Sequence, residues 1–314
     1  MKNKGMTETF AGFVAIIGPT NAGKSTLLNT IMGRKAAIVS HKVQTTRTKL
    51  RAVKMVGDVQ LIFVDTPGIF KPARKLDRAM VKSAKDSMAD ADAVLVMIDA
   101  KHGITETIKE IVHSTQRKSG EAEQAKPEVH GTPVFAVINK VDAVKKETLL
   151  PLAKELGDMN IFKEIFMISA EKNQGIEPML NVLADVMPKS PLLFDGRDAV
   201  DVPDELWLAE ITREKIYRFI HQELPYHIHV ATDKMELADD GVAEIAQTIH
   251  VKSDGHKKIV IGKNGEQLKK IGMLARHEIQ DEWGRKARLK LFVRVEDWEN
   301  NKEHYESQGL TYVG

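Results

Sequence analysis

The chain has 314 residues, of which 42% are hydrophobic, and its formal net charge is +2. This length is comfortable for two domains, and the apolar fraction is too high for a wholly disordered protein. Because the sequence has no cysteine, disulfides, cysteine-ligated zinc and thiol catalysis are excluded, and a reducing compartment fits. The nearly balanced charge means that any nucleic-acid surface must come from local charge asymmetry.

The apolar run at residues 13–18 is too short to span a membrane and ends in a glycine-rich segment. It follows two lysines, as the core of a signal peptide would, but no small-residue cleavage site comes after it. The run is therefore better explained as a buried strand, and we expect a cytoplasmic protein.

Short runs rich in Val and Ile alternate with helical patterns in the first half of the chain. The runs are nearly continuous, as expected for strands covered on both faces. This alternation predicts an α/β domain, residues 1–187, with a mostly parallel sheet wrapped by helices. The expected strands are 13–18, 60–64, 93–99, 133–138 and 164–168, with an antiparallel edge strand at 49–56; the expected helices are 24–32, 76–90, 104–118, 145–156 and 175–187.

The order of elements changes in the second half. Residues 188–203 hold three of the eleven prolines, so 188–205 is expected to be a linker. An αββαβ order then predicts a small α+β domain over 206–299. Residues 119–131 are interpreted as a polar surface insertion. Residues 300–314 are interpreted as a tail without a recognisable pattern. The expected elements of the second domain are helices 206–223 and 266–283 and strands 227–237, 244–252, 257–261 and 287–295.

Residues 18–25, Gly-Pro-Thr-Asn-Ala-Gly-Lys-Ser, fit the pattern G-x-x-x-x-G-K-[ST] between an expected strand and an expected helix. Glycines let successive N–H groups face a phosphate, and the helix N-terminus adds positive potential. Lys24 would supply charge to the β- and γ-phosphates, and the Ser25 hydroxyl would ligate Mg²⁺. The expected nucleotide contacts are Gly18, Asn21, Ala22, Gly23, Lys24, Ser25 and Thr26.

A second phosphate element, Asp65-Thr66-Pro67-Gly68, follows the strand at 60–64. A carboxylate at a strand end can reach the metal, and the Gly68 N–H can approach a γ-phosphate because no side chain intervenes. Thr46, favoured over Thr45, lies in a polar stretch where its hydroxyl could complete the Mg²⁺ shell; a solvated loop threonine is the alternative. The expected metal ligands are Ser25, Thr46 and Asp65, and Thr66 and Pro67 join Asp65 and Gly68 as nucleotide contacts.

The base-recognition element is Asn139-Lys140-Val141-Asp142, which follows the strand at 133–138. Asp142 can accept hydrogen bonds from the guanine N1–H and 2-amino groups, which adenine lacks. Asn139 is expected to tie this loop to the phosphate loop, and the Lys140 stem to lie over the base. The backbone of Ser169-Ala170, after the next strand, could cap guanine O6. The cofactors expected are therefore GTP or GDP with Mg²⁺.

Residues 259–271 form an apolar run, a Gly262-Lys-Asn-Gly265 loop and a helix with basic and apolar faces. This pattern resembles the core of a KH domain, whose G-x-x-G loop clamps about four nucleotides of a single strand. Residues 255–294 hold eleven Lys and Arg against four Asp and Glu, so their attraction for RNA should weaken with salt. The expected RNA contacts are Ile259, Ile261, Gly262, Lys263, Asn264, Gly265, Lys269 and Lys270, with one of the two isoleucines facing the core.

Together these elements resemble the translation-factor-like GTPases, and with the carboxy-terminal pattern they resemble the Era family of bacterial ribosome-assembly GTPases over about residues 10–299. The resemblance implies a Ras-like P-loop GTPase domain followed by a type II KH domain. It also implies a role in maturing the small ribosomal subunit, binding near the 3′ end of its RNA, and some peripheral association with the inner face of the cell membrane. We expect a monomer.

Ile69 follows Gly68, where Ras-like proteins carry a glutamine that orients water. Isoleucine cannot hydrogen-bond to water, so slow intrinsic hydrolysis is expected and the catalytic group stays unassigned. Related GTPases with asparagine at the position of Asn21 can use K⁺ to offset developing charge. Coordination of K⁺ by Asn21 is a hypothesis, and a structural loop asparagine is the alternative.

Two other functions remain open at this level. The C-terminal domain could be only a docking module of a GTPase that acts on protein or membrane partners. An ATPase is the other alternative, and Asp142 argues against it. His227 and His229, placed on one strand face, suggest a metal pair, but nothing in the sequence alone completes a ligand set.

Overall fold

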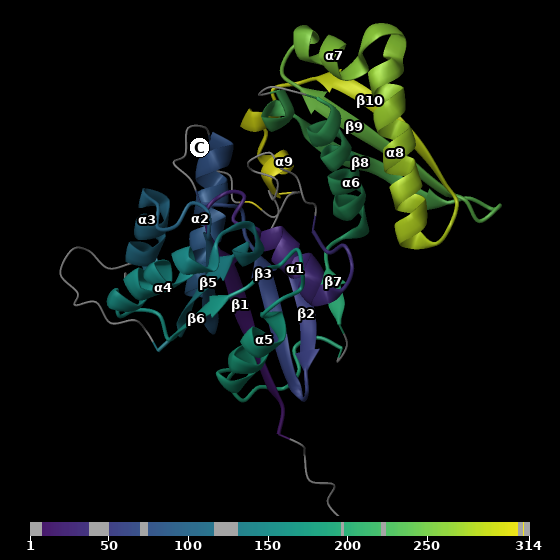
Figure 1. The fold of residues 1–314 in the computed structure, drawn as a ribbon. Helices are drawn as coiled ribbons and strands as arrows, with labels where there is room; N and C mark the ends of the chain where they lie inside the picture. The colour runs from purple at the N-terminus through teal and green to yellow at the C-terminus, as the bar shows by residue number, and fades with distance from the viewer. Residues whose placement is uncertain are drawn as a thin grey trace, which may run out of the picture. The chain divides into compact units, whose positions relative to one another are not determined.

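A computed structural model describes residues 8–37, 50–69, 75–115, 131–195, 198–220, 224–306 and 310. The chain divides into two compact units, the first ending at Asp201 and the second beginning at Val202. Figure 1 shows their helices and strands.

The first unit is built on a seven-stranded sheet in the order β6-β5-β4-β1-β3-β2-β7. The pairs formed by β1, β3, β4, β5 and β6 are parallel, whereas β2 runs antiparallel to β3 and to β7. The mostly parallel sheet predicted from the apolar runs is therefore confirmed. The strands are β1 (Phe10–Ile17), β2 (Leu50–Val56), β3 (Val59–Asp65), β4 (Ala93–Asp99), β5 (Val134–Asn139), β6 (Glu164–Met167) and β7 (Ala199–Asp201).

Helices cover both faces of this sheet, which explains why its strands are apolar on both sides. Side chains of α1 and α5 pack on one face in a core with Val14 and Ile16. Side chains of α2, α3 and α4 pack on the other face with Ala15 and Ile17. The helices are α1 (Lys24–Met32), α2 (Lys75–Ala89), α3 (Glu106–Thr115), α4 (Leu149–Asp158) and α5 (Ile176–Asp185).

Most of the segment expected to be a linker, 188–205, instead belongs to the first unit, which includes the described residues up to Asp201, whereas Val202 and the residues after it belong to the second. Gln60 is fully buried, and its side-chain oxygen accepts hydrogen bonds from the backbone N–H groups of Leu193 and Phe194 at 2.9 and 3.0 Å. Strand β7 then pairs with β2, so β2 is antiparallel as predicted but is not the edge strand. This strand could not be predicted from the sequence because it spans only three residues and lies in a proline-rich segment.

The second unit places helices against a three-stranded sheet of order β10-β9-β8, in which β8 and β9 are antiparallel and β9 and β10 are parallel. Apolar side chains of α6, α7 and α8 meet those of the sheet in its core. The elements are α6 (Asp204–Phe219), β8 (His229–Leu237), β9 (Ala243–Val251), α7 (Asp254–Ile261), α8 (Glu266–Trp283), β10 (Ala287–Val295) and a short α9 (Lys302–Glu306).

The strand expected at 257–261 is wrong, because this segment is the end of helix α7. The Ser253 hydroxyl accepts a hydrogen bond from the His256 N–H at 3.3 Å and caps the helix. Of the three apolar residues Ile259-Val260-Ile261, only Val260 is fully buried. In a strand, Ile259 and Ile261 would share one face and Val260 the other, whereas in this helix only Val260 faces the core. The observed order is αββααβ, with a helix where a strand was expected.

The C-terminal residues also differ from the featureless tail expected for 300–314. Tyr305 is fully buried, and its hydroxyl donates to the Glu299 carbonyl at 3.0 Å. Leu310 is 3% exposed. The segment has too few apolar residues to give a periodic pattern, yet Tyr305 and Leu310 are buried in the structure. Among the described helices, none combines the length and the hydropathy that crossing a bilayer would require.

Candidate functional site

The polar motifs of the first unit follow the carboxyl ends of neighbouring parallel strands. In an open α/β sheet these ends form the rim at which ligands bind. The phosphate loop follows β1, Asp65 ends β3, Asp99 ends β4, and Asn139 ends β5. The sheet order places these four strands side by side, and β1, β3 and β5 are labelled in Figure 1.

The phosphate loop curls in the way that its glycines predict. Gly18 and Gly23 have φ angles of 155° and 95°, which favour glycine, and Asn21 has a φ of 63° in the left-handed region that asparagine tolerates. The Lys24 ammonium is enclosed by the loop and donates to the carbonyls of Gly18 and Pro19 at 3.2 and 2.9 Å. Burial lowers the pKa of Lys24 to about 8, although the charge of Asp65 raises it. A phosphate bound in the loop would offset this desolvation of the lysine charge.

The predicted Mg²⁺ ligands Ser25 and Asp65 are brought together. The Ser25 Oγ donates to Asp65 Oδ2 at 3.0 Å, and the Asp65 side chain is buried. Hydroxyl and carboxylate oxygens are the donors that Mg²⁺ takes beside a nucleotide, so the residues present fit this ion. Thr46, the third predicted ligand, lies outside the described residues.

Thr66 fixes the loop after β3, in which Pro67 is also buried. The Thr66 hydroxyl donates to the Ile16 carbonyl at 2.9 Å, which fastens this loop to β1. A Cβ on Gly68 would lie 2.9 Å from Thr20 Cγ2 and 3.0 Å from its backbone nitrogen. The two phosphate elements are thus in direct contact, and a residue larger than glycine would separate them.

Ile69 joins the loops through its backbone, because its N–H donates to the Gly18 carbonyl at 3.0 Å. Its side chain is 6% exposed and packs in the core between the sheet and α2, α3 and α4. The side chain therefore serves packing, which agrees with the expectation that it orients no water.

Asn139 connects the base loop with the phosphate loop, as predicted. Its side-chain nitrogen donates to the Ala22 carbonyl at 2.9 Å, and its side-chain oxygen accepts from the Ala170 N–H at 3.0 Å. Ala170 in turn accepts from the Thr30 hydroxyl on α1 at 2.7 Å. One asparagine thus links three loops at the rim. Thr30 was not singled out in the sequence, where no pattern distinguishes it from other helix threonines.

Lys140 is fixed by its backbone conformation and by two hydrogen bonds of its ammonium group. Its φ angle is 64°, and its ammonium donates to the Asn21 carbonyl and to Asp99 Oδ2, both at 2.7 Å. Burial alone would raise the pKa of Asp99, but its hydrogen bond to Lys140 and other contacts lower it. Asp99 was missed in the sequence, and the signal that could have found it is an aspartate at the end of a parallel strand.

Asp142 lies in the short 3₁₀ turn Val141–Ala143, and its side chain is exposed. Ser169 is fully buried, and its backbone exchanges hydrogen bonds with Gln174 at 3.0 and 3.1 Å. The turn that carries the guanine-recognition candidate is linked to the turn expected to cap O6, since the Val141 N–H donates to the Ile168 carbonyl at 3.2 Å.

In the second unit, the Gly262–Gly265 loop connects α7 to α8. Both glycines have positive φ, 75° and 77°, and Asn264 has a φ of 52°. A Cβ on Gly262 would lie 2.5 Å from Gln267 Cβ, whereas one on Gly265 would meet nothing within 4 Å. Gly262 is thus required for the joint between the helices, and Gly265 leaves its backbone open to a ligand.

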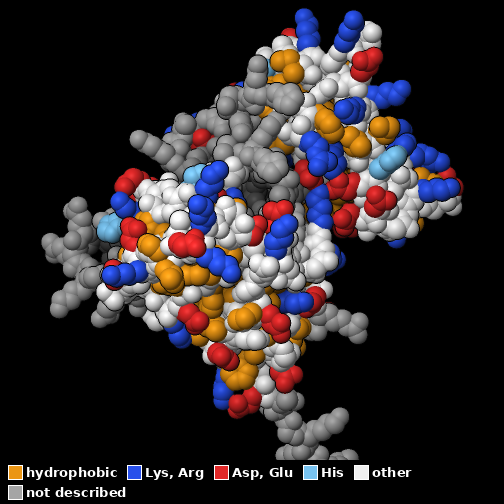
Figure 2. All heavy atoms as spheres, in the orientation of Figure 1, with side chains coloured by type: hydrophobic (Ala, Val, Ile, Leu, Met, Phe, Trp, Pro, Cys, Tyr) orange, Lys and Arg blue, Asp and Glu red, His pale blue; other side chains and the backbone are white. Residues whose placement is uncertain are grey.

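The side chains around this loop suit a polyanion. Lys263, Asn264 and Lys269 are exposed, and the Lys270 ammonium lies 4.4 Å from the centroid of the Phe219 ring. Figure 2 shows Lys and Arg side chains gathered over the part of the second unit that carries α7 and α8. Ile259 is 53% exposed and Ile261 is half-buried, so the expectation that one of them enters the core is wrong; Val260 does so instead.

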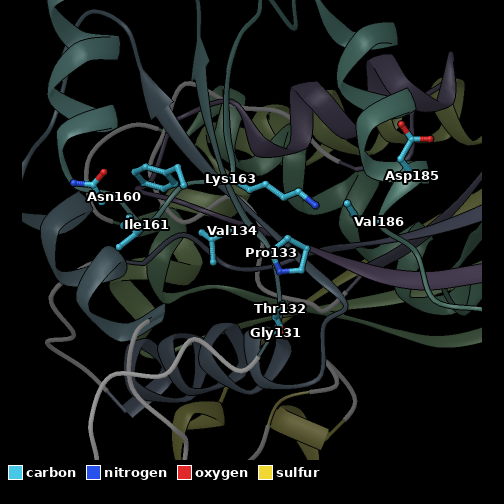
Figure 3. Close-up of a pocket in the computed structure, with 10 residues that line it drawn as sticks. Gly131, Thr132, Pro133, Val134, Asn160, Ile161, Lys163, Asp185 and Val186 are labelled. Carbon is cyan, nitrogen blue, oxygen red and sulfur yellow. The ribbon is translucent and has the colours of Figure 1, made fainter.

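A separate hollow of about 570 Å³ lies near the start of β5, lined by Gly131–Val134, Asn160–Lys163, Asp185 and Val186 (Figure 3). Because Val134 begins β5 and Asn139 ends it, this hollow is at the opposite end of the strand from the rim. None of the predicted phosphate or base motifs lines it. It therefore does not compete with the rim as the nucleotide site.

Comparison with known proteins agrees with this division. The family model described as 50S ribosome-binding GTPase matches residues 13–140, and the KH domain model matches residues 223–300. GTPase Era of Rhizobium meliloti strain 1021 is 44% identical over 98% of this chain and 95% of its own length. GTPase Era of Afipia carboxidovorans is also 44% identical, over 97% of this chain and 95% of its own.

Two solved structures are similar over most of the chain. One is a variant of Aquifex aeolicus Era bound to GDP and AlF₄⁻, and the other is Era in complex with MgGDPNP and nucleotides 1506–1542 of 16S ribosomal RNA. Each has a TM-score of 0.86 and 35% identity, and each match covers 96% of this chain and 99% of the other.

The fold and the two sites define a P-loop GTPase joined to a KH domain, a protein that hydrolyses GTP and binds RNA. The chain belongs to the Era family of GTPases.

Proposed function

We propose that this chain is a guanine-nucleotide-controlled RNA-binding factor that acts in assembly of the small ribosomal subunit. The nucleotide binds at the rim formed by the ends of β1, β3, β4 and β5, with Lys24 on the phosphates and Asp142 on guanine. Single-stranded RNA from the 3′ end of the small-subunit ribosomal RNA binds at the Gly262–Gly265 loop.

One observation carries the proposal: a single chain holds an assembled phosphate-and-base rim and an open G-x-x-G loop on a basic surface. The rim is tied together by Asn139, which bonds to Ala22 and Ala170. The loop offers the Gly265 backbone without obstruction. A relative that is 35% identical has been solved with MgGDPNP and 16S ribosomal RNA nucleotides 1506–1542, which supports both ligand classes.

The nucleotide would control RNA binding through the loops that touch a γ-phosphate. Gly68 contacts Thr20 of the phosphate loop, and Thr46 is the proposed Mg²⁺ ligand that responds to the γ-phosphate. GTP would hold these loops, and hydrolysis would release them.

The direct test measures binding of an RNA oligonucleotide with the 3′-terminal sequence of small-subunit ribosomal RNA. The full chain is titrated with Mg²⁺ and either a non-hydrolysable GTP analogue or GDP, at fixed salt because salt alone shifts RNA affinity. Tighter binding with the analogue supports the proposal. Equal, negligible RNA binding in both states would favour the second candidate, a GTPase with a protein- or membrane-docking module.

We also propose that intrinsic hydrolysis is slow because Ile69 cannot orient water. Replacing Ile69 with Gln places an amide in the apolar core, at a cost of about 1–3 kcal/mol, and should not accelerate GTP turnover. Ile69→Leu is the matched packing control. A faster Ile69→Gln enzyme would show that the side chain reaches the reacting water after all.

Asn21 remains our candidate K⁺ ligand, and it is exposed in the phosphate loop with a left-handed backbone φ of 63°. Faster turnover in K⁺ than in Na⁺ buffer, lost in Asn21→Ala, supports this role; equal turnover removes it.

We further propose that the protein is a cytoplasmic monomer with peripheral contact to the inner face of the membrane. Sedimentation and flotation with anionic vesicles test these two statements.

A further inference from the structure

Three histidines and one glutamate gather on the face of the second-unit sheet opposite its helices. His229 and His250 are directly opposite each other across the β8–β9 pair. Their neighbours Ile228 and Ile249 point into the core under the helices, so the strand alternation turns both imidazoles to the other face. Both histidines are nevertheless buried, at 4% and 5% exposure.

The C-terminal segment buries them. The ring of His304, from α9, lies with its centroid 4.7 Å from that of His229 and 4.8 Å from that of His250. The Trp298 ring lies 5.6 Å from His229. Residues from β8, β9 and two positions after β10 therefore converge on one small volume.

The Glu296 carboxylate lies within hydrogen-bond distance of two of these imidazoles. His250 Nδ1 lies 2.8 Å from Glu296 Oε2, and His304 Nε2 lies 3.4 Å from Glu296 Oε1. One potential ligand atom from each of the three residues lies within 4.8 Å of the others. In a tetrahedral zinc site with bonds of about 2.0–2.1 Å, ligand atoms are about 3.4 Å apart. Small side-chain rotations would therefore bring the three ligand atoms to the distances that a zinc ion requires.

We propose that His250, Glu296 and His304 bind a divalent transition-metal ion of the zinc type, and that this ion fastens the C-terminal helix to the KH sheet. Two imidazoles and one carboxylate suit Zn²⁺ and leave a fourth position for water. Mg²⁺ and Ca²⁺ prefer all-oxygen ligand sets. The ion is thus distinct in class from the Mg²⁺ of the nucleotide rim.

The ligand set differs from the pair that the sequence suggested. The pair suggested by the sequence, His227 and His229, is not the one assembled. His227 lies in a 3₁₀ turn and its Nδ1 is 3.3 Å from Glu299 Oε1, whereas His229 lines the cluster without joining the three closest ligand atoms.

The test uses the full chain, freed of metal with a chelator and then saturated with Mg²⁺ and GDP so that the rim is occupied. Equilibrium dialysis against Zn²⁺ should give one bound ion per chain. Co²⁺ at the same site should give the visible absorption of a four-coordinate ion. Loss of a ligand in His304→Asn or His250→Gln should weaken Zn²⁺ binding by more than about 100-fold, since even outer partners of metal ligands are worth about 10- to 100-fold.

His277→Asn, which replaces an exposed histidine on α8, is the matched control and should bind like the wild type. The fastening of the C-terminal helix is read independently by hydrogen exchange of residues 302–306, which should slow when Zn²⁺ is added. If the wild-type chain with its rim occupied binds less than one Zn²⁺ per chain in the dialysis, the proposal is overturned. This outcome depends on the wild-type chain alone, so it stands even if a variant folds poorly.

Discussion

Gly23 and Asn139 are packed so closely that a Cβ on Gly23 would lie 2.2 Å from Asn139 Nδ2. The same Nδ2 donates to the Ala22 carbonyl at 2.9 Å. The phosphate loop and the base loop are therefore fitted to each other through one glycine and one amide, and a change at either residue should be felt by both parts of the nucleotide.

Gly23→Ala should weaken GDP binding by about tenfold or more, equivalent to about 1.4 kcal/mol, because Asn139 must move out of the rim. The Gly23 φ of 95° adds backbone strain of about 1–3 kcal/mol in the folded state. Calorimetric titration with GDP and denaturant unfolding measure the two effects.

Gly33→Ala is the control for this prediction. Gly33 also has a positive φ, 63°, at the end of α1, but a Cβ there would meet nothing within 4 Å. It should lose a similar amount of stability and keep its GDP affinity. Equal losses of GDP affinity in the two variants would show that strain, not the contact with Asn139, decides binding.

Asp142→Asn should change base preference from guanine to xanthine nucleotides. An amide presents a donor as well as an acceptor, so it pairs with the xanthine 2-oxo group but loses the charged acceptor for guanine. The loss for GDP should be on the order of 100-fold, as hydrogen bonds to a charged group are worth about 1.5–3 kcal/mol. Competition binding with GDP and XDP measures it.

Asp158→Asn, at the exposed end of α4, removes the same charge from the same unit and should leave the preference for GDP unchanged. Retention of normal GDP selectivity by Asp142→Asn would mean that another group reads the base.

The Asp99–Lys140 pair should make part of the stability of the first unit depend on pH. The pKa of Asp99 is lowered in the folded chain, so the unfolded state binds the proton more readily. The stabilisation is present above the unfolded value of about 3.9 and is lost as the pH falls through the lower folded pKa.

Asp99→Asn should therefore lower the denaturation midpoint at pH 7, and this difference from the wild type should shrink as the pH is lowered through that range. The contribution is modest because Lys140 is 38% exposed. A difference that does not change with pH would mean that the ion pair contributes nothing measurable.

Gly265→Asp should abolish RNA binding and leave GDP binding intact. The loop at Gly265 has room for a side chain, so the new carboxylate would face the RNA phosphates rather than disturb the core. Gly284→Asp is closely matched, since Gly284 also has a positive φ, 61°, and open space around it. RNA affinity that falls equally in both variants would argue against this loop as the clamp.

Much of the nucleotide rim could be predicted from the sequence because its parts are contiguous motifs that follow buried strands. The phosphate loop, Asp65 and Asn139 were found in this way, and the structure brings them together. Asp99 and Thr30 escaped because each acts through one long-range hydrogen bond and lies in no local pattern.

The errors in the fold have similar causes. Ile259-Val260-Ile261 is apolar enough for a strand, but the Ser253 cap and the core position of Val260 favour a helix. The strand Ala199–Asp201 is only three residues long and becomes visible only through its pairing with β2. The histidine cluster depends on cross-strand register and on the docked C-terminus, neither of which a single sequence displays.

A crystal structure of the full chain with Mg²⁺ and a non-hydrolysable GTP analogue tests the central claim most directly. We predict that the β- and γ-phosphates contact Lys24, that Mg²⁺ lies between Ser25 and a γ-phosphate oxygen near Asp65, and that Asp142 accepts from guanine. Electron density for the nucleotide at any other place, with the rim left vacant at saturating ligand, would contradict the account.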